Sequence, residues 1–148
     1  MSNKLIGAAA VILDSDERVL LVKHSYGKLN WDLPGGLAEK NESAQQTAMR
    51  EVSEETGLSV EAGRLTGIYY EPNHDMHHFV FLCAYGGEQQ PVPASPEITD
   101  SGYFAIDNLP KPISDFTIQR IRDAIDAAGH PPFRLIGPRK WIEAEECV

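Results

Sequence analysis

Residues 43–56 constrain the fold more than any other segment, because they predict a helix with both ends marked. Ser43 and Gln46 are spaced as a capping box at the start, and Gly57 stands where a helix commonly ends on a left-handed residue. Small or apolar side chains gather on one face of this helix, at Ala48, Met49, Val52 and Thr56. That face can be buried only against another layer of structure, so the segment predicts a helix packed on a sheet.

Runs of β-branched and aromatic residues before and after this helix predict strands. The predicted strands are residues 8–13, 19–22, 64–70, 78–85 and 103–106. Residues 14–17 predict a hairpin turn between the first two, and residues 31–36, with one proline and two glycines, are expected to end regular structure. A second helix is predicted from about residue 115 to residue 128, where Gly129 and two prolines stop it. Helices and strands intermixed around one core predict an α/β sandwich with a mixed sheet.

The length and charge of the chain limit the class of protein. Its 148 residues predict one domain, residues 1–148, and its net charge of −9 argues against binding a nucleic-acid polymer, which requires clustered lysines and arginines. The longest apolar run, residues 6–13, is too short to span a bilayer. No cleavable signal pattern opens the chain, and the positions of Cys83 and Cys147 suggest no disulfide framework. We therefore expect a cytoplasmic protein.

Three carboxylates share one face of the first predicted helix. At about 100° per residue, Glu51, Glu54 and Glu55 fall within about 100° of arc, beside the apolar face. They repel one another by roughly 0.2–0.5 kcal/mol per pair, and near the C-terminal end the helix dipole disfavours each by roughly 0.3–1 kcal/mol. A bound divalent cation reverses both effects, and carboxylate oxygens suit Mg²⁺ or Mn²⁺. Without further evidence, such a cluster can equally be interpreted as an acidic surface exposed to solvent.

The spacing around the glutamates favours the metal site. The chain resembles the Nudix hydrolase family at every position of the Nudix box, and the matching residues are Gly36, Glu42, Arg50, Glu51, Val52, Glu54, Glu55, Gly57 and Leu58. Such a match occurs by chance in fewer than roughly one in a million chains. Residues 7–13 with 18–23, residues 31–36, and Glu97 with the segments 102–104 and 108–110 resemble further parts of the family. The resemblance covers about residues 5–128, and residues 129–148 form a C-terminal extension with no assigned role.

The resemblance implies the Nudix fold, an α/β/α sandwich with a mixed sheet, and hydrolysis of a nucleoside diphosphate linked to another group with Mg²⁺ or Mn²⁺. The metal ligands it implies are Glu51, Glu54, Glu55 and the backbone carbonyl of Gly35. Arg50 is expected to orient the glutamates. Either Glu51 or Glu54 is expected to take the proton of the attacking water. Glu97 is the candidate for a further metal ligand or base outside the box.

The candidates for binding the substrate are His24, Lys28, Trp31 and Tyr70. His24 and Lys28, with Tyr26 between them, follow the second predicted strand and are expected to touch a phosphate or a base. Trp31 is expected either to stack on a nucleobase or to pack beside the following proline. Residues 74–78 include three histidines without the spacing of a zinc site, so an exposed loop leading into a strand is expected there.

A short chain without an added N-terminal domain favours a MutT-like nucleoside triphosphate pyrophosphohydrolase. An ADP-ribose or nucleotide-sugar pyrophosphatase is the first alternative, and a Nudix-fold binding protein without turnover is the second. The expected partner is a small nucleotide and neither a nucleic-acid polymer nor a membrane. Because Nudix enzymes are often dimers, a homodimer is a further expectation.

Overall fold

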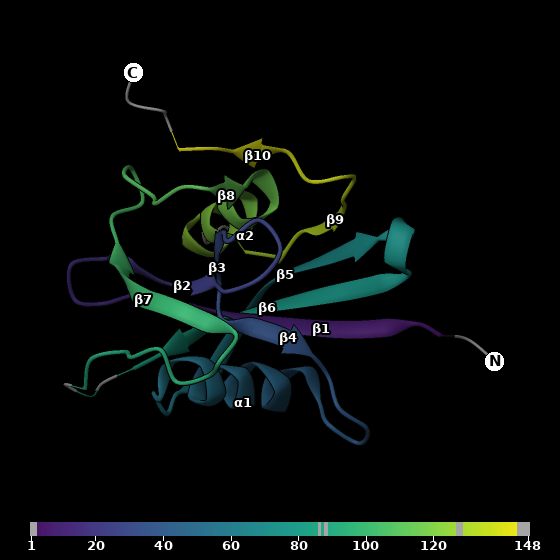
Figure 1. Ribbon diagram of the computed structural model, residues 1–148. Coiled ribbons are helices and arrows are strands. Elements are labelled where there is room, and N and C mark those ends of the chain that lie inside the picture. Colours follow the sequence, from purple (N-terminus) through teal and green to yellow (C-terminus); the bar gives the residue numbers. More distant parts are fainter. Residues whose placement is uncertain (1–2, 86, 88, 127–128, 145–148) are drawn as a thin grey trace.

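Two mixed sheets and two α-helices make up the computed structural model, which describes residues 3–85, 87, 89–126 and 129–144 (Figure 1). The first sheet has the strand order β4 (Gly35–Leu37), β1 (Leu5–Ile12), β6 (Met76–Ala84), β5 (Glu61–Glu71), β9 (Phe133–Leu135). The second has the order β10 (Trp141–Ile142), β8 (Ile113–Ser114), β3 (Trp31–Asp32), β2 (Val19–His24), β7 (Ile98–Phe104). The helices are α1 (Ala44–Thr56), α2 (Asp115–Ile125) and the short 3₁₀ helix η1 (Pro72–His74). The predicted α/β fold class is confirmed.

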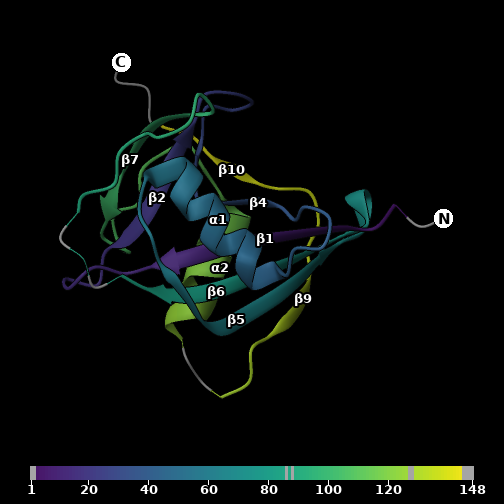
Figure 2. The ribbon, with the colours of Figure 1, turned by 90° about the horizontal axis from the view of Figure 1, so that it is seen from below.

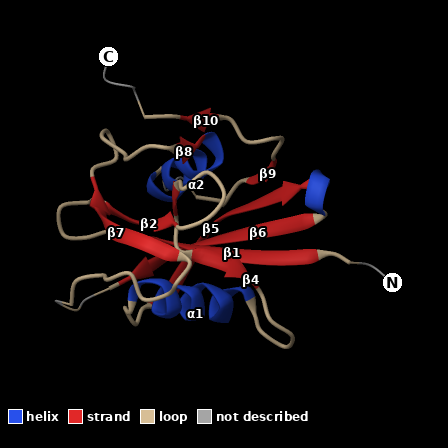
Figure 3. Cartoon of the chain, viewed as in Figure 1, coloured by secondary structure: helices blue, strands red, loops and turns tan. Residues whose placement is uncertain are grey.

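Strand β1 is an inner strand of the first sheet, between β4 and β6, with α1 on one side of that sheet and α2 on the other (Figure 3). It runs parallel to β6 and antiparallel to β4. Successive side chains of a strand point to opposite faces. Ala8, Ala10 and Ile12 therefore pack in the cluster that includes α1, while Ala9 and Val11 pack in the cluster that includes α2. Burial on both faces explains why this strand is apolar throughout rather than alternating.

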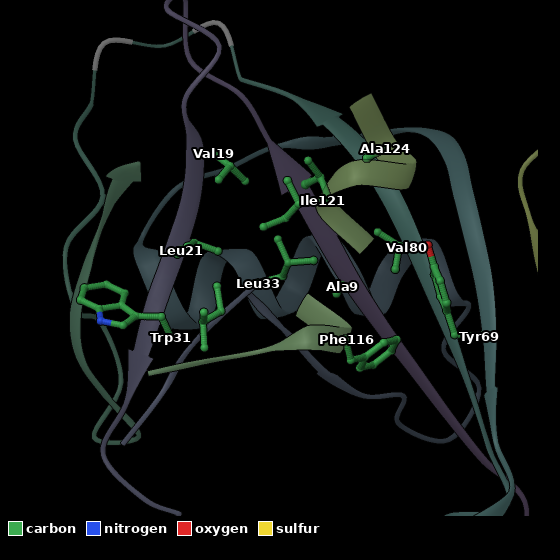
Figure 4. Packing of buried hydrophobic residues seen from close by; sticks show 12 residues of the cluster. Ala9, Val19, Leu21, Trp31, Leu33, Tyr69, Val80, Phe116, Ile121 and Ala124 are labelled. Atoms are coloured by element: carbon green, nitrogen blue, oxygen red, sulfur yellow. The ribbon is translucent and has the colours of Figure 1, made fainter. Parts of the chain in front are cut away.

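The second cluster fills the space between the two sheets beside α2 (Figure 4). Val19 and Leu21 enter it from β2, Val80 enters from β6, and Ile121 and Ala124 enter from α2. Burying an apolar side chain of this size contributes roughly 1.5–3 kcal/mol. The cluster thus fixes the position of α2 between the sheets.

The predicted turn at residues 14–17 is present, but the strands on its two sides do not continue as a paired hairpin. Leu13 and Val19 form only an isolated bridge, after which β1 and β2 enter different sheets. Both edges of β1 are occupied, by β4 and by β6, so neither is left for β2. Strand β2 pairs with β3 and β7 instead.

Residues 31–36 form short strands on both sides of Pro34, so the expectation that they end regular structure is wrong. The Pro34 carbonyl accepts the Ala10 N–H at 3.0 Å, which needs no donor from the proline. The next residue, Gly35, lies so close to β1 that a Cβ would be 2.5 Å from the Ala8 carbonyl oxygen. Only glycine permits this approach, which places the backbone of β4 beside α1.

The predicted ends of α1 are confirmed. Ser43 and Gln46 form the reciprocal capping box, and Gly57 has a φ of 75°. Helix α2 begins after Ser114, whose hydroxyl caps it, and residues 127 and 128 of the predicted helix lie outside the described residues. A strand was predicted at residues 103–106, but the observed strand, β7, begins earlier, at Ile98, and ends at Phe104.

After α2 the chain returns along the body of the protein, with β9 beside β5 and β10 beside β8 (Figure 2). The described strands of the C-terminal extension therefore pair with strands of the same chain. Cys83 is a buried free thiol, and Cys147 lies outside the described residues. No helix in the described part of the chain combines the length and apolar character needed to cross a bilayer.

Candidate active site

The glutamate-bearing face of α1 lies against the backbone of β4. The Gly35 N–H donates to Glu55 Oε1 at 3.4 Å. A Cβ on Gly36 would lie 2.7 Å from Glu51 Oε1, so the absence of a side chain lets this carboxylate reach the strand. The apolar face of α1, predicted from the sequence, packs on the first sheet and thereby directs the neighbouring glutamates at these glycines. The structure thus brings Glu51, Glu55 and Gly35 together.

Arg50 binds the acidic residues on both sides of it. Its Nη1 donates to Glu51 at 2.8 Å and to Glu54 at 3.1 Å. Its Nε donates to Glu42 at 2.7 Å, and its Nη2 donates to the Leu37 carbonyl at 3.1 Å. The hydrogen bonds from Arg50, with one from Thr47, lower the pKa of Glu42 to about 2. One guanidinium therefore fixes the loop before α1 and two of the predicted site glutamates in a single arrangement.

Glu55 is buried, and only one of its two carboxylate oxygens accepts a hydrogen bond within the described residues. The residue is 6% exposed, and its Oε2 has no hydrogen-bond partner among the residues that the structure describes. Burial, followed by the adjacent Glu51 carboxylate, raises the pKa of Glu55 to about 10. Arg50 supplies a positive charge to Glu51, but no ion pair joins Glu55 to a cation within the described residues, so ionisation of Glu55 beside Glu51 is unfavourable at neutral pH.

This pair of carboxylates fits a hard divalent cation. In the described part of the chain, no three Asp, Glu, His or Cys side chains are placed to hold a metal by themselves. Mg²⁺, however, keeps several of its waters and usually takes one or two carboxylates from the protein. The unpartnered oxygen of Glu55 and the adjacent Glu51 carboxylate are oxygen donors of that kind. Glu54, whose side chain is 54% exposed, lies at the outer side of the pair beside Arg50.

A cavity of about 170 Å³ opens beside the same glycines. It is lined by Gly7, Ala8, Ala9, His24, Tyr26, Asp32, Leu33, Gly35, Gly36, Leu37, Met76, His78, Phe116, Arg120 and Arg139. These residues come from both sheets, from α2 and from the segment between β9 and β10. The cavity is smaller than the roughly 300–1,000 Å³ of typical small-molecule pockets, so it suits one part of a substrate.

One wall of the cavity is a buried ion pair. Arg120 Nη2 donates to Asp32 Oδ1 at 2.7 Å, and the Thr117 hydroxyl donates to the same oxygen at 2.7 Å. Burial by itself would raise the pKa of Asp32, but the Arg120 charge and the Thr117 hydrogen bond outweigh it and hold this pKa below its usual range. The guanidinium of Arg120 also lies 4.0 Å from the centroid of the Phe116 ring. The pair is thus charge-balanced and held rigidly by α2.

A second charged cluster centres on Glu71, a buried residue at the end of β5. Arg139 donates to its two oxygens at 3.2 Å each, His78 Nε2 lies 3.0 Å from Oε1, and His74 contacts Oε2. Burial opposes ionisation, yet Arg139 and the two histidines lower the pKa of Glu71 to about 2. Burial, then the nearby Arg120, lowers the pKa of His78 to about 4. His78 is therefore neutral at pH 7 and lines the cavity. The sequence predicted a strand from residue 78 after an exposed loop, and it gave His78 no role in the site.

Sequence reasoning missed the pairs Asp32–Arg120 and Glu71–Arg139. Their members are separated by 88 and 68 residues, and no local spacing marks such pairs. One signal was present, since Arg120 follows Phe116 by four residues and so interrupts the apolar face of α2.

The candidate substrate residues separate into two groups. His24 and Tyr26 line the cavity, with their rings stacked at 4.7 Å between centroids. Lys28 instead lies 3.7 Å from Glu143 and over the Trp141 ring. Trp31 is buried against Phe104, which agrees with the packing alternative and leaves no face for a nucleobase. These last two residues do not line the cavity.

Neither Tyr70 nor Glu97 lines the cavity. The Tyr70 hydroxyl donates to Asp75 at 2.7 Å, and its ring contacts His77, so it is outside the cavity lining. Glu97 is exposed, and its carbonyl accepts the Ser25 N–H at 2.8 Å. Burial, then the charges of Glu55 and Glu97, raise the pKa of Tyr26. Glu97 is therefore near enough to the site to act on Tyr26 electrostatically.

Comparison with known proteins adds an independent observation. A sequence profile of the NUDIX domain matches residues 3–123. A MutT-like protein of Streptomyces ambofaciens is 32% identical over 124 residues, which cover 84% of this chain and 79% of that protein. A putative 8-oxo-dGTP diphosphatase of Bacillus subtilis is 39% identical over 83 residues, which are 55% of this chain and 55% of that protein. The structure of an ADP-ribose pyrophosphatase of Streptococcus suis has a TM-score of 0.70 and 26% identity, over 90% of this chain and 100% of that one.

Proposed function

The chain belongs to the NUDIX family, and on that premise we propose that it hydrolyses a diphosphate linkage in a small nucleotide, with Mg²⁺ as cofactor. The favoured substrate is a nucleoside triphosphate. One observation carries the proposal: the buried Glu55 carboxylate has an unpartnered oxygen and lies next to the Glu51 carboxylate at the glycines of β4. This arrangement is unfavourable without a cation and becomes favourable with one.

Glu51, Glu55 and the Gly35 carbonyl are the groups we assign to the ion, with Mn²⁺ as a substitute for Mg²⁺. Glu54 and Glu97 are the candidates for further ligands as the substrate binds. When bound, the ion supplies positive charge that stabilises phosphoryl oxygens and favours ionisation of water.

The remaining chemistry belongs to the side chains of α1. A base must accept the proton of a water that attacks phosphorus, and its carboxylate must be reachable by that water. Glu54 is the more exposed of the two candidate bases, whereas Glu51 is turned into the buried pair, so we assign the base to Glu54. Arg50 positions both carboxylates through Nη1. It acts on the reaction through them rather than on the substrate.

Similar proteins point to two classes of substrate. The MutT-like and 8-oxo-dGTP diphosphatase relatives support a nucleoside triphosphate. The likeness to an ADP-ribose pyrophosphatase, which extends over that whole chain, supports a nucleoside diphosphate sugar as the alternative. A cytoplasmic location and a homodimer stay predictions, and sedimentation of the purified protein measures the second.

A substrate panel tests this proposal. Release of phosphate and pyrophosphate is measured for the common NTPs and dNTPs, for 8-oxo-dGTP and for ADP-ribose, in Mg²⁺ and in EDTA. We expect Mg²⁺-dependent release of pyrophosphate from at least one triphosphate. Turnover of ADP-ribose alone selects the alternative. No turnover of any nucleotide in Mg²⁺ or Mn²⁺ overturns the proposal and leaves a binding protein.

A further inference from the structure

The C-terminal extension contributes a wall to the cavity. It leaves the end of α2, pairs with β5 through β9, and then crosses above α2 to pair with β8 through β10 (Figures 1 and 2). Arg139 lies between these two strands and lines the cavity. The NUDIX profile ends at residue 123. Arg139 therefore lies outside the segment that the profile matches.

Arg139 is held firmly but retains the capacity to bind a ligand. Its two η nitrogens each donate to one oxygen of Glu71, and its guanidinium lies 5.0 Å from the Phe116 centroid. These bonds use two of the five N–H groups of an arginine. No acceptor among the described residues takes the other three. A preoriented guanidinium of this kind loses little entropy when it donates to a ligand.

Each arginine that lines the cavity is paired with a carboxylate. Arg120 is balanced by Asp32, Arg139 is balanced by Glu71, and His78 is neutral at pH 7. A further phosphate gains little attraction from such a lining, whereas an uncharged group with hydrogen-bond acceptors matches it. Tyr26, 54% exposed and stacked on His24, offers a flat aromatic face to that group. These features together favour a planar heterocycle.

We propose that the C-terminal extension completes a nucleobase pocket, and that Arg139 selects bases that present adjacent acceptors. Guanine presents O6 and N7 as acceptors on one edge, which is the edge an arginine binds with two parallel hydrogen bonds. Adenine presents a donor amino group where guanine has O6, so Arg139 disfavours it. This inference rests on the proposed function in taking the substrate to be a nucleotide.

Equilibrium binding of GMP and AMP, measured by calorimetry in EDTA, tests the inference without catalysis or metal. We expect the wild type to bind GMP about tenfold more tightly than AMP, and Arg139→Gln to bind both with nearly equal affinity. Arg134→Gln is the matched control, because Arg134 lies on the same extension and makes a two-bond pair with Asp123 outside the cavity. It is expected to keep the preference for GMP.

Loss of Arg139 alone leaves the buried Glu71 carboxylate with histidine partners only, which destabilises the fold. The double variant Glu71→Gln/Arg139→Gln removes both charges together, and we expect it to lose the preference as well. An equal loss of affinity for both nucleotides places the Arg139 contact on the shared ribose phosphate and overturns the inference. Equal affinity of the wild type for both, or binding of neither, also overturns it.

The two proposals fail separately. A protein that hydrolyses no nucleotide but binds GMP through Arg139 contradicts the proposed function and supports the pocket. A protein that hydrolyses GTP and ATP equally, with the Arg139→Gln variant keeping the same ratio of kcat/KM, supports the proposed function and contradicts the pocket.

Discussion

Arg50 shows at the residue scale how much of the site depends on one side chain. It donates to Glu42, Glu51 and Glu54 and to a backbone carbonyl. A lysine has a single nitrogen and no planar fork, so it cannot hold these acceptors at once. We expect Arg50→Lys to lower kcat by about 10–100-fold, as removal of residues that orient ligands does elsewhere.

Steady-state hydrolysis of the best nucleotide checks this effect of Arg50→Lys, with urea unfolding run in parallel. Arg18→Lys is the control, because Arg18 pairs with Asp14 in an exposed turn far from the glutamates. A kcat of Arg50→Lys within twofold of the wild type contradicts the positioning role.

Glu71 predicts how stability depends on pH. Its pKa in the folded protein is about 2, below its ordinary value of 4.5, so the folded state favours the charged carboxylate. Its contribution to stability is therefore complete above about pH 4.5 and is lost as pH falls toward 2. We expect Glu71→Gln to lower the free energy of unfolding by about 1–3 kcal/mol at pH 7 and by much less near pH 2.

Urea unfolding of wild type and Glu71→Gln at several pH values measures this difference. Asp16→Asn is the control, because Asp16 lies in an exposed turn. It is expected to leave the free energy of unfolding unchanged both at pH 7 and near pH 2. A difference between the wild type and Glu71→Gln that stays constant from pH 7 to pH 2 would show that the Glu71 charge does not stabilise the fold.

Some residues of the candidate site could be predicted from the sequence and others could not. Glu51 and Glu55 were found because helix periodicity and a local motif place them together. Glu71 and Arg139 were not, because their partnership depends on where β9 and β10 return to the body of the protein. For Trp31 the sequence left two alternatives, because an aromatic residue is suited to a core or to a base until its burial is known.

At the scale of elements, β4 depends on two adjacent glycines for different reasons. A Cβ on Gly35 would meet the backbone of β1 at 2.5 Å, whereas a Cβ on Gly36 would meet the flexible Glu51 side chain at 2.7 Å. We expect Gly35→Ala to lower the free energy of unfolding by about 1–3 kcal/mol or more, because the strand must shift. We expect Gly36→Ala to cost less stability but to abolish most activity by displacing Glu51.

Urea unfolding and kcat, measured on both variants, separate the two effects. Gly137→Ala is the control, since a Cβ there meets nothing within 4 Å. Equal losses of stability and activity in Gly35→Ala and Gly36→Ala contradict this division of roles.

The elements themselves were predictable where the signal is local. The capping box and Gly57 fixed both ends of α1. The pairing of β1 was not predictable, because the choice of β4 and β6 over β2 is a property of the whole sheet. The composition of residues 14–17 predicted correctly that the chain turns there. It does not indicate which strands pair with one another.

At the scale of the whole molecule, ion binding and stability are linked. An ion that binds only the folded state stabilises it by about 2.7 kcal/mol at a concentration one hundred times its Kd. We expect Mg²⁺ to raise the free energy of unfolding of the wild type in this way. Glu55→Gln removes one of the paired carboxylates, so its stability is expected to be nearly independent of Mg²⁺.

Urea unfolding with and without Mg²⁺ checks this linkage without an enzyme assay. Glu61→Gln, an exposed acid on β5, is the control and is expected to respond to Mg²⁺ as the wild type does. Equal Mg²⁺ responses of the wild type and Glu55→Gln contradict the assignment of the ion to this pair.

The most direct test of the whole account is the kcat of Glu54→Gln under saturating Mg²⁺, on the nucleotide that the wild type hydrolyses best. Glu54 lies outside the core, and its replacement by the amide of equal size leaves packing unchanged. We expect the kcat of Glu54→Gln to be about 10²–10⁴-fold below that of the wild type, while its circular dichroism spectrum stays the same. Turnover at the wild-type rate would contradict the assignment of the reaction to these glutamates.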